Sequence, residues 1–263
     1  MKDNFKFKKY FGQNFLKDNN VIDKIMNGAS IDKETLVIEV GPGSGVLSKR
    51  IIPKSGFSIL YEIDEELREH LLNYLKFDNY RIIFGDFLKA DIGKDIVDYK
   101  YDKIYVVANL PYYITTPIIN KLIDEVLPDR LVIMVQKEVA DRLVANVGSK
   151  DYGSLTVFLN YYYDITKLMD VSRNCFVPSP NVDSSVIVMD LKKDRFFVKN
   201  IDLFKNLVRD SFQFKRKNIK NNLKKYDLEV VGSVLSKYGF DLGVRAEELD
   251  LEIFLELANE LSK

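Results

Sequence analysis

The chain has 263 residues with 39 basic and 39 acidic side chains, so its formal net charge is zero, and 46% of it is apolar. That length and apolar fraction support one large domain, or a large and a small one, and exclude wholesale disorder. A single cysteine and a single histidine exclude a disulfide framework and a histidine or cysteine metal cluster. The lack of a long apolar run or signal-like segment predicts a cytoplasmic protein without a membrane partner.

The N-terminal arm, residues 4–16, is both basic and aromatic. Five lysines but one acid lie within the first 17 residues, and phenylalanine and tyrosine are interspersed among them. Lys8 and Lys9 are therefore predicted to contact RNA phosphates, because basic grooves with aromatic rings suit phosphates and stacked bases. The alternative is that the aromatic side chains pack the arm onto the core. The apolar spacing that follows predicts a helix over residues 18–29.

A glycine-rich turn follows a predicted buried strand over residues 36–38. It reads Glu39-Val40-Gly41-Pro42-Gly43-Ser44-Gly45, and a helix is predicted over residues 46–52. Glycine permits positive φ and lets a ligand lie against the backbone, so backbone N–H groups are expected to face a ligand here. A dinucleotide fingerprint needs glycine at position 46, which is valine, and a phosphate loop needs lysine there. The remaining pattern is typical of methyltransferases that use S-adenosylmethionine, with Glu39, Gly41, Gly43 and Gly45 as cofactor-binding candidates.

Acidic residues follow the next two predicted strands, residues 57–61 and 81–84. Glu62 lies about twenty residues after the first glycine, the spacing of a carboxylate that accepts from both ribose hydroxyls. Asp86 is expected to accept from the exocyclic amine of adenine, and Asp64 to cap the helix after Glu62. Ile63 and Phe87 adjoin these acids and join them as candidates. One strand-end acid is often only a turn residue, but this combination predicts an S-adenosylmethionine site.

The strand predicted over residues 104–108 runs into Asn109-Leu110-Pro111-Tyr112, which carries the predicted chemistry. A base amino group is a poor nucleophile because its lone pair is delocalised into the ring, so two acceptors should be aimed at its N–H bonds. Asn109 supplies a side-chain oxygen, and Pro111 keeps Leu110 extended so that its carbonyl can be the second acceptor. Tyr112 offers a face for stacking the extruded base. A proline turn after a strand is the alternative.

Strand and helix signals alternate as far as residue 145, with further helices predicted over 117–126 and 137–145 and a strand over 131–135. This alternation predicts a doubly wound α/β fold of the Rossmann-like, class I methyltransferase type. In such sheets the ligand lies at the carboxyl ends of the strands, where Gly41, Glu62, Asp86 and Asn109 fall. Two later strands, residues 161–165 and 185–191, are expected to complete the sheet.

The strand pattern stops at residue 194. Helices are predicted over residues 201–212, 217–225, 230–238 and 249–261. We therefore expect a Rossmann-like domain over residues 1–193 and a small all-helical domain over residues 194–263.

Basic residues cluster again between Lys205 and Lys225, eight against the single acid Asp210. A local basic patch on a neutral protein indicates a polyanionic partner. RNA contacts are accordingly predicted for Arg209, Lys215, Arg216, Lys217 and Lys220. Solubility alone is the alternative, since most basic runs mean no more than that.

Several stretches together carry a resemblance to a known family. They are residues 9–16 (Lys-Tyr-Phe-Gly-Gln-Asn-Phe-Leu), the turn over 39–45, Gly85-Asp86, residues 109–112, residues 136–143, residues 152–155 and residues 176–184 (Phe-Val-Pro-Ser-Pro-Asn-Val-Asp-Ser). On these the chain resembles the small-subunit (16S-type) ribosomal RNA adenine N6,N6-dimethyltransferases, the KsgA family, from the arm into the helical domain. The arm and the 176–184 segment are the specific part, because other amino methyltransferases share Asn-Leu-Pro-Tyr. Tyr113 departs from the asparagine of some members.

The resemblance implies that Gln13, Asn14 and Leu16 line the cofactor site and that Phe176 closes the adenine pocket opposite Tyr112. It implies dimethylation of two adjacent adenosines in the 3′-terminal hairpin loop of small-subunit rRNA, in a pre-assembled particle, by a monomer that contributes to ribosome biogenesis without a metal. It also makes Lys215-Arg216-Lys217 the rRNA-binding segment. A large-subunit rRNA methyltransferase of the antibiotic-resistance type and a non-catalytic assembly factor on the same fold are the alternatives.

Two single residues complete the predictions. Cys175 is expected to be a small apolar core residue rather than the nucleophile of a cytosine-5 methyltransferase, because Asn174 precedes it and no general base is evident. His70 is expected on the surface of the helix after Glu62.

Overall fold

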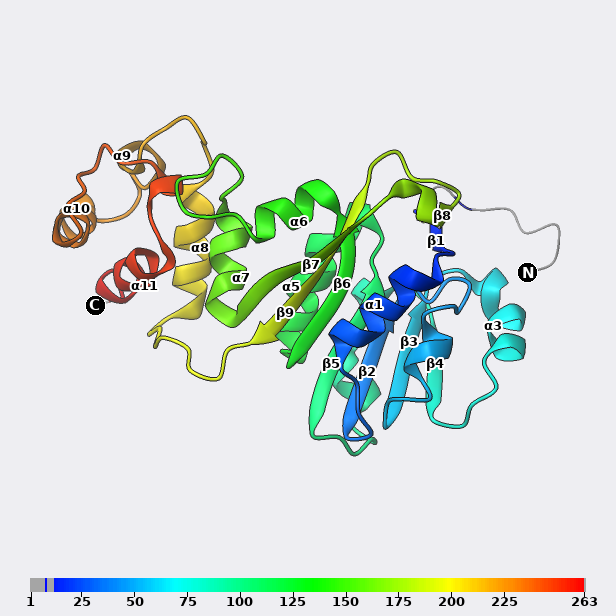
Figure 1. Cartoon of the computed structure of the whole chain (residues 1–263). Helices are drawn as coiled ribbons and strands as arrows, with labels where there is room; N and C mark the ends of the chain where they lie inside the picture. The colour runs from blue at the N-terminus through cyan, green and yellow to red at the C-terminus, as the bar shows by residue number, and fades with distance from the viewer. Residues whose placement is uncertain (1–7, 9–11, 263) are drawn as a thin grey trace. The chain divides into compact units, whose positions relative to one another are not determined.

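A computed structural model describes residue 8 and residues 12–262 of the chain, which is drawn in Figure 1. Lys9 and the aromatic residues of the arm before residue 12 lie outside the described residues. Two units make up the chain: Met1–Ala140 with Thr166–Leu191, and Asp141–Ile165 with Lys192–Lys263. The second unit therefore includes residues 141–165, which the sequence assigns to the first domain, while its second stretch begins close to the predicted boundary at residue 194.

A seven-stranded sheet organises the first unit. Its order is β4 (Tyr80–Phe84), β3 (Phe57–Glu62), β2 (Thr35–Val40), β5 (Lys103–Asn109), β6 (Arg130–Gln136), β9 (Ser184–Leu191) and β7 (Tyr163–Val171). The first five strands are parallel, and β9 is antiparallel to β6. All six residues of β2 are buried, as expected of a central parallel strand covered on both faces. The predicted Rossmann-like class is confirmed.

Helices cover this sheet on both faces, with α1 (Asn19–Ala29) in front of it and α5 (Thr115–Glu125) behind it in Figure 1. The Asp18 side chain caps α1 by accepting from the N–H groups of Asn20 and Val21. The apolar side of α1 packs on alternate residues of β2, β5 and β6. Shorter helices and 3₁₀ turns connect the strands: α2 (Ser48–Ile51), η2 (Glu65–Leu67), α3 (Arg68–Tyr74), η3 (Phe87–Lys89), α4 (Ile92–Ile96), η4 (Tyr112–Ile114) and η5 (Arg173–Cys175).

A two-stranded antiparallel ladder joins the arm to a segment far along the chain. In it β1 (Phe15–Leu16) pairs with β8 (Phe176–Val177), so that Leu16 lies opposite Phe176. The Lys17 N–H extends the pairing by donating to the Cys175 carbonyl at 2.9 Å. The sequence pattern predicts neither strand, because two residues are too short for a period to show.

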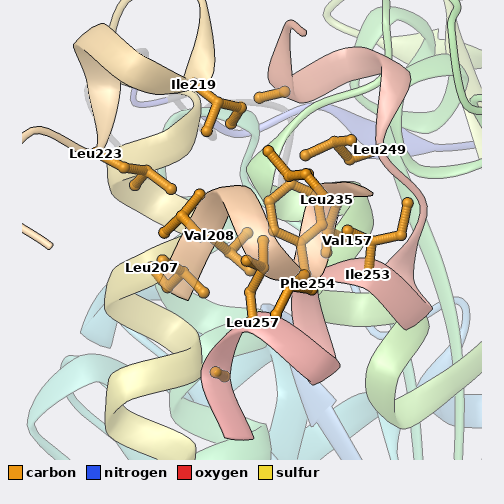
Figure 2. Packing of buried hydrophobic residues seen from close by; sticks show 14 of the residues in the cluster. Val157, Leu207, Val208, Ile219, Leu223, Leu235, Leu249, Ile253, Phe254 and Leu257 are labelled. Atoms are coloured by element: carbon orange, nitrogen blue, oxygen red, sulfur yellow. The ribbon is translucent and has the colours of Figure 1, made fainter. Parts of the chain in front are cut away.

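The second unit is helical. It contains the end of α6 (Lys137–Leu143), α7 (Ser154–Tyr162), α8 (Ile201–Ser211), α9 (Ile219–Asn222), α10 (Leu228–Lys237), η6 (Ala246–Glu248) and α11 (Leu251–Glu260). Figure 2 shows side chains of α7, α8, α10 and α11 meeting in one apolar core, including Val157, Leu207, Leu235 and Phe254. Burial of these side chains supplies most of the stabilisation of the unit.

Two predicted elements have different bounds in the structure in this part of the chain. The strand predicted over residues 161–165 begins only at Tyr163, because Tyr161 and Tyr162 complete α7. Thr156, Val157, Leu159 and Tyr162 give α7 a buried helical face that the sequence interpretation missed. The helix predicted over residues 217–225 shrinks to α9, which Asn218 caps by accepting from the Asn221 N–H.

Candidate active site

A pocket opens at the carboxyl ends of β2, β3 and β5. Strand order reverses between β2 and β5, which is where parallel sheets bind ligands. The pocket encloses about 750 Å³ of space, including its opening to solvent. It is lined by Gly12, Gln13, Asn14, Phe15, Leu16, Glu39, Gly41, Pro42, Gly43, Ser44, Val46, Leu47, Glu62, Ile63, Asn109, Leu110, Pro111 and Tyr112. The fold therefore brings together the arm, the glycine turn and the Asn-Leu-Pro-Tyr segment.

The glycine turn differs from the prediction that its N–H groups face a ligand. The Gly41 N–H donates to the Tyr61 carbonyl at 2.8 Å, and the Gly45 N–H donates to the Pro42 carbonyl at 2.8 Å. The Gly43 N–H donates to Glu62 Oε2 at 2.9 Å. With these donors engaged inside the protein, the turn supplies shape rather than the cluster of free N–H groups that holds a phosphate.

Positive φ explains the glycines on the pocket side of this turn. Gly41 has φ +74°, and a Cβ there would project into open space with nothing within 4 Å. Gly43 has φ +56°, and a Cβ there would lie 2.8 Å from Cε1 of Phe15, so a side chain would displace the arm. The turn thus leaves a cradle that any other residue would begin to fill.

Glu62 ends β3 with its carboxylate facing the pocket, although the residue is only 3% exposed. Besides the Gly43 N–H, the Asp64 N–H donates to its Oε1 at 2.9 Å. Burial raises the pKa of Glu62, and the backbone hydrogen bonds oppose that rise. Each carboxylate oxygen carries two lone pairs, so Glu62 retains capacity to accept from a ligand diol.

Glu39 is a second buried carboxyl beside the same pocket. It is 1% exposed, and its Oε2 has no hydrogen-bond partner among the described residues. Burial raises the pKa of Glu39 to about 8, while the nearby Ser48 hydroxyl opposes the rise and repulsion from Glu62 adds to it. Because a nearby cation stabilises the ionised form of a buried carboxyl, a positively charged ligand at this position would lower the pKa of Glu39.

Glu39→Gln is expected to remove a pH dependence of stability. Below pH 4.5 the carboxyl is protonated in the folded and unfolded chain; between 4.5 and about 8 only the folded state keeps its proton. The free energy of unfolding should therefore fall as pH rises through this window, by up to about 1.4 kcal/mol per pH unit. Urea unfolding of the variant and the wild type from pH 4 to 9 measures the difference. The exposed Glu34→Gln is the control, and a difference that does not change with pH would contradict the assignment.

The charge of the lining decides which cofactor fits. Among the described lining residues there are two acids, Glu39 and Glu62, and no lysine, arginine or histidine. An anionic dinucleotide or nucleoside triphosphate would be left without cationic partners. S-adenosylmethionine carries a sulfonium cation, an ammonium group and a ribose diol, so it fits a lining rich in acceptors. Glu62 would hold the ribose, and Glu39 would lie beside the cationic part.

Asn109 and Tyr112 have fixed orientations beside the pocket. Asn109 Nδ2 donates to the Asn14 carbonyl at 3.0 Å. Because a carbonyl only accepts, this bond assigns the amide nitrogen to the arm and leaves Oδ1 free to face a substrate amine. The Tyr112 hydroxyl lies 2.5 Å from Ser184 Oγ, and burial raises its pKa, so the ring is held as a neutral platform. Ser184 is a supporting residue that sequence reasoning missed, although it ends the 176–184 motif.

The Leu110–Pro111 step leads from β5 into η4. Pro111 is extended, with φ −60° and ψ 124°, and Leu110 is buried at 1% exposure. The Leu110 N–H donates to the Met134 carbonyl at 3.1 Å, which fixes the peptide to β6. Leu110 lines the pocket, and an acceptor role for its carbonyl remains a prediction.

Four predicted site residues do not line the pocket. Asp86 caps η3 by accepting from the Leu88 N–H, and Phe87 packs edge-on against Tyr61 with ring centroids 5.0 Å apart. Gly45 lies beneath α3, where a Cβ would come within 3.1 Å of Leu71 and Tyr74. Phe176 is 2% exposed within the apolar cluster under α1. Their predicted contacts with the cofactor or the target base remain predictions.

The sequence predicts an apolar core position for Cys175 and a surface position for His70. Cys175 packs partly buried against the cluster under α1, and burial raises its pKa, which keeps the thiol protonated and unreactive. His70 is half-buried, and its Nε2 lies 3.1 Å from the Ser44 carbonyl. The surface prediction for His70 is therefore wrong, since its ring supports the glycine turn from α3.

The predicted RNA contacts fall into two groups. Arg209, Lys215, Arg216, Lys217 and Lys220 are exposed in the helical unit. Lys8 instead has a side-chain exposure of 19% and forms ion pairs with Asp64 at 2.6 Å and with Glu66 at 3.0 Å. Lys8 therefore contacts protein carboxylates where the sequence predicted phosphates.

Two further features bear on the class of protein. No helix in the described part of the chain combines the length and apolar character needed to cross a bilayer. Within residues 8 and 12–262, no three His, Cys, Asp or Glu side chains are grouped as metal ligands.

Comparisons with known proteins show the family of the chain. The family model for ribosomal RNA adenine dimethylase matches residues 4–263. The chain is 42% identical to ribosomal RNA small subunit methyltransferase A of Clostridium acetobutylicum, over 99% of this chain and 95% of the relative. It is 44% identical to the protein of the same name from Clostridium botulinum, over 97% and 94%.

Solved structures give the same result. A dimethyladenosine transferase from Plasmodium falciparum superposes with a TM-score of 0.78 at 30% identity, covering 92% of this chain and 95% of that one. The 23S rRNA methyltransferase ErmE superposes with a TM-score of 0.73 at 25% identity, covering 95% and 100%. The pocket, the Asn-Leu-Pro-Tyr segment and these matches lead to one conclusion: the chain belongs to the ribosomal RNA adenine dimethylase family.

Proposed function

We propose that this chain transfers methyl groups from S-adenosylmethionine to the N6 amino groups of two adjacent adenosines in the 3′-terminal hairpin loop of small-subunit rRNA. One observation carries the proposal: among the described residues, the pocket is lined by two buried acids and no basic residue, and Asn109, which also lines it, uses its amide nitrogen to bind the Asn14 carbonyl. A cationic methyl donor fits the first feature, and a base amino group fits the second.

The residues of the chain act mainly by positioning. When bound, S-adenosylmethionine supplies an electrophilic methyl group. Asn109 Oδ1 and the Leu110 carbonyl accept hydrogen bonds from the two N–H groups of the adenine amine. The lone pair of the nitrogen is thereby localised and directed toward the methyl carbon. Tyr112, braced by Ser184, presents a ring face to the extruded base. No residue need abstract a proton before transfer, because the ammonium product loses its proton afterwards.

The proposed substrate is the rRNA inside a pre-assembled small ribosomal particle, and the proposed state of the enzyme is a cytoplasmic monomer. Exposed basic residues of the helical unit suit RNA phosphates. The relatives named above are small-subunit methyltransferases, whereas the ErmE structure shares the fold with an enzyme of 23S rRNA. Particle specificity is therefore the point to test first.

Methyl transfer from labelled S-adenosylmethionine tests the proposal. The acceptors are small particles that lack these methyl groups, large particles, and naked rRNA, and the product is identified by nucleoside mass spectrometry. N6,N6-dimethyladenosine formed on small particles alone is the expected result. Product on large-subunit RNA would instead assign the chain to the antibiotic-resistance type. Cofactor binding without transfer to any acceptor would favour an assembly factor on the same fold.

A further inference from the structure

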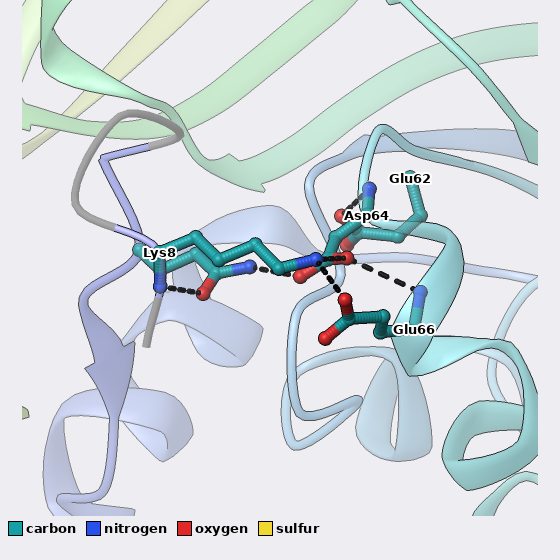
Figure 3. A network of polar contacts seen from close by, with 5 residues as sticks. Lys8, Glu62, Asp64 and Glu66 are labelled. Atoms are coloured by element: carbon teal, nitrogen blue, oxygen red, sulfur yellow. Dashed lines mark hydrogen bonds and ion pairs between the residues drawn. The ribbon is translucent and has the colours of Figure 1, made fainter. Parts of the chain in front are cut away.

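Asp64 is a buried carboxylate that the proposed mechanism does not use. It lies two residues after Glu62, is 1% exposed and, as predicted, caps η2 by accepting from the Glu66 N–H. Figure 3 shows that the N-terminal arm also reaches it. Lys8 Nζ lies 2.6 Å from its Oδ1, and Gln13 Nε2 donates to its Oδ2 at 2.6 Å. A cap alone would need neither contact.

The arm residues are also tied to each other. The Lys8 N–H donates to Gln13 Oε1 at 2.7 Å, so both ends of the Gln13 amide are engaged. Lys8 Nζ pairs in addition with Glu66 Oε1 at 3.0 Å. The hydrogen bond that Lys8 donates to Asp64 raises the pKa of Lys8. Burial raises the pKa of Asp64, but the bonds that Lys8 and Gln13 donate to it hold that pKa below its usual value. Both groups therefore stay charged at neutral pH, and loss of Lys8 would leave the buried Asp64 carboxylate without its charged partner.

This network borders the cofactor pocket on two sides. Through its backbone, Asp64 donates to Glu62 Oε1 at 2.9 Å, which orients the carboxylate assigned to the ribose. Through its side chain, it holds Gln13, and the arm residues from Gly12 to Leu16 form one wall of the pocket. The same wall supplies the Asn14 carbonyl that orients Asn109. One carboxylate thus connects the wall of the pocket with the residue that faces the ribose.

We propose that Asp64 is a positioning residue which, through Lys8 and Gln13, latches residues 12–16 of the N-terminal arm against the S-adenosylmethionine pocket and so sets how tightly the cofactor is held. The identity of that cofactor rests on the proposed function; the latch itself rests on the contacts of the arm. Lys8 belongs to this latch and does not contact RNA.

Lys8→Met tests the latch, because it removes the ammonium and keeps an unbranched side chain. S-adenosylmethionine affinity, measured by calorimetry, should fall roughly tenfold, as expected when a buried charge pair loses one partner. Amide hydrogen exchange over residues 12–16, followed by mass spectrometry without cofactor, should accelerate several-fold. Lys17→Met is the matched control, since Lys17 directly follows the arm and is exposed. The control should leave both measurements unchanged.

A double-mutant cycle separates the latch from a general loss of structure. Asp64→Asn keeps a good cap for η2 but removes the charge that pairs with Lys8. If the two residues act as a pair, the double variant should lose no more affinity than the single variant with the larger loss. Additive losses, or wild-type affinity and exchange in Lys8→Met, would overturn the latch. So would a Lys8→Met variant that binds cofactor normally but binds the ribosomal particle weakly, because Lys8 would then be an RNA contact.

The failure of the proposed function would look different. A wild-type chain that binds no S-adenosylmethionine would refute the cofactor assignment and with it the effect of the latch on affinity. The exchange of residues 12–16 in Lys8→Met and Asp64→Asn would still decide whether Asp64 fastens the arm.

Discussion

Asn109→Ala is expected to reduce methyl transfer on the order of 10³-fold while changing S-adenosylmethionine affinity only a few-fold. The reason is that Oδ1 of Asn109 acts on the target amine, and loss of one preorganised polar group at a reacting centre commonly has an effect of this size. Single-turnover transfer to small ribosomal particles measures the rate, and calorimetry measures the affinity. Asn109 Nδ2 also binds the Asn14 carbonyl, which accounts for the small effect on affinity.

Asn109→Asp sharpens this test. Aspartate keeps an acceptor oxygen but cannot donate to the Asn14 carbonyl, so the side chain should rotate away from it and transfer should again fall by at least tenfold. Asn73→Ala, an exposed change on α3, is the control and should retain full activity. Near-normal turnover of Asn109→Ala would refute the acceptor mechanism, whatever the effect on binding.

Local sequence signals predicted the sheet and the strand ends. Short aliphatic runs ending in Gly41, Glu62, Asp86 and Asn109 correspond to β2, β3, β4 and β5, and the fold places these four ends along one edge. Such runs are informative because a strand buried on both faces tolerates few polar residues, so its end is marked by the first one. Of the four, Asp86 is the one that does not line the pocket.

Long-range pairing could not be predicted in the same way. The β1–β8 ladder joins residues 15–16 to residues 176–177, and no periodic pattern encodes which short segments meet. The Asp64 network depends on the same meeting of distant parts, because Lys8 and Asp64 are 56 positions apart. In sequence, Asp64 has the features of an ordinary helix cap, which it also is. Burial distinguishes it from an exposed cap, and both Lys8 and Gln13 bind its carboxylate.

The hydrogen bonds of the glycine N–H groups explain why the prediction that they face a ligand failed. A glycine pattern predicts backbone shape, because φ depends on local sterics. Where each N–H points depends on neighbouring strands: Gly41 binds the Tyr61 carbonyl of β3, and Gly43 binds Glu62 at the end of the same strand. The acid assigned to the ribose therefore also consumes a donor that a phosphate would need. This coupling favours a cationic cofactor over a phosphate more directly than the motif does.

Replacing Lys215, Arg216 and Lys217 together by alanine is expected to weaken binding to small ribosomal particles on the order of 10²-fold at low salt. All three side chains are exposed in the helical unit between α8 and α9, and in the structure Lys215 Nζ donates only weakly, at 3.4 Å, to the Lys150 carbonyl. Each phosphate contact contributes about 0.7 to 0.9 to the slope of log affinity against log salt. The slope should therefore decrease by roughly 2 to 3 in the variant.

The slope of log affinity against log salt distinguishes RNA binding by the basic segment from a role in solubility. Lys24, Lys76 and Lys94 are equally exposed lysines of the first unit, and their triple alanine variant removes the same charge. If the basic segment contacts phosphates, the slope should fall in the Lys215-Arg216-Lys217 variant alone, and cofactor affinity should be unchanged in both. Equal losses in the two variants would mean that net charge attracts the particle without a defined contact. An unchanged slope with greater aggregation would assign the segment to solubility.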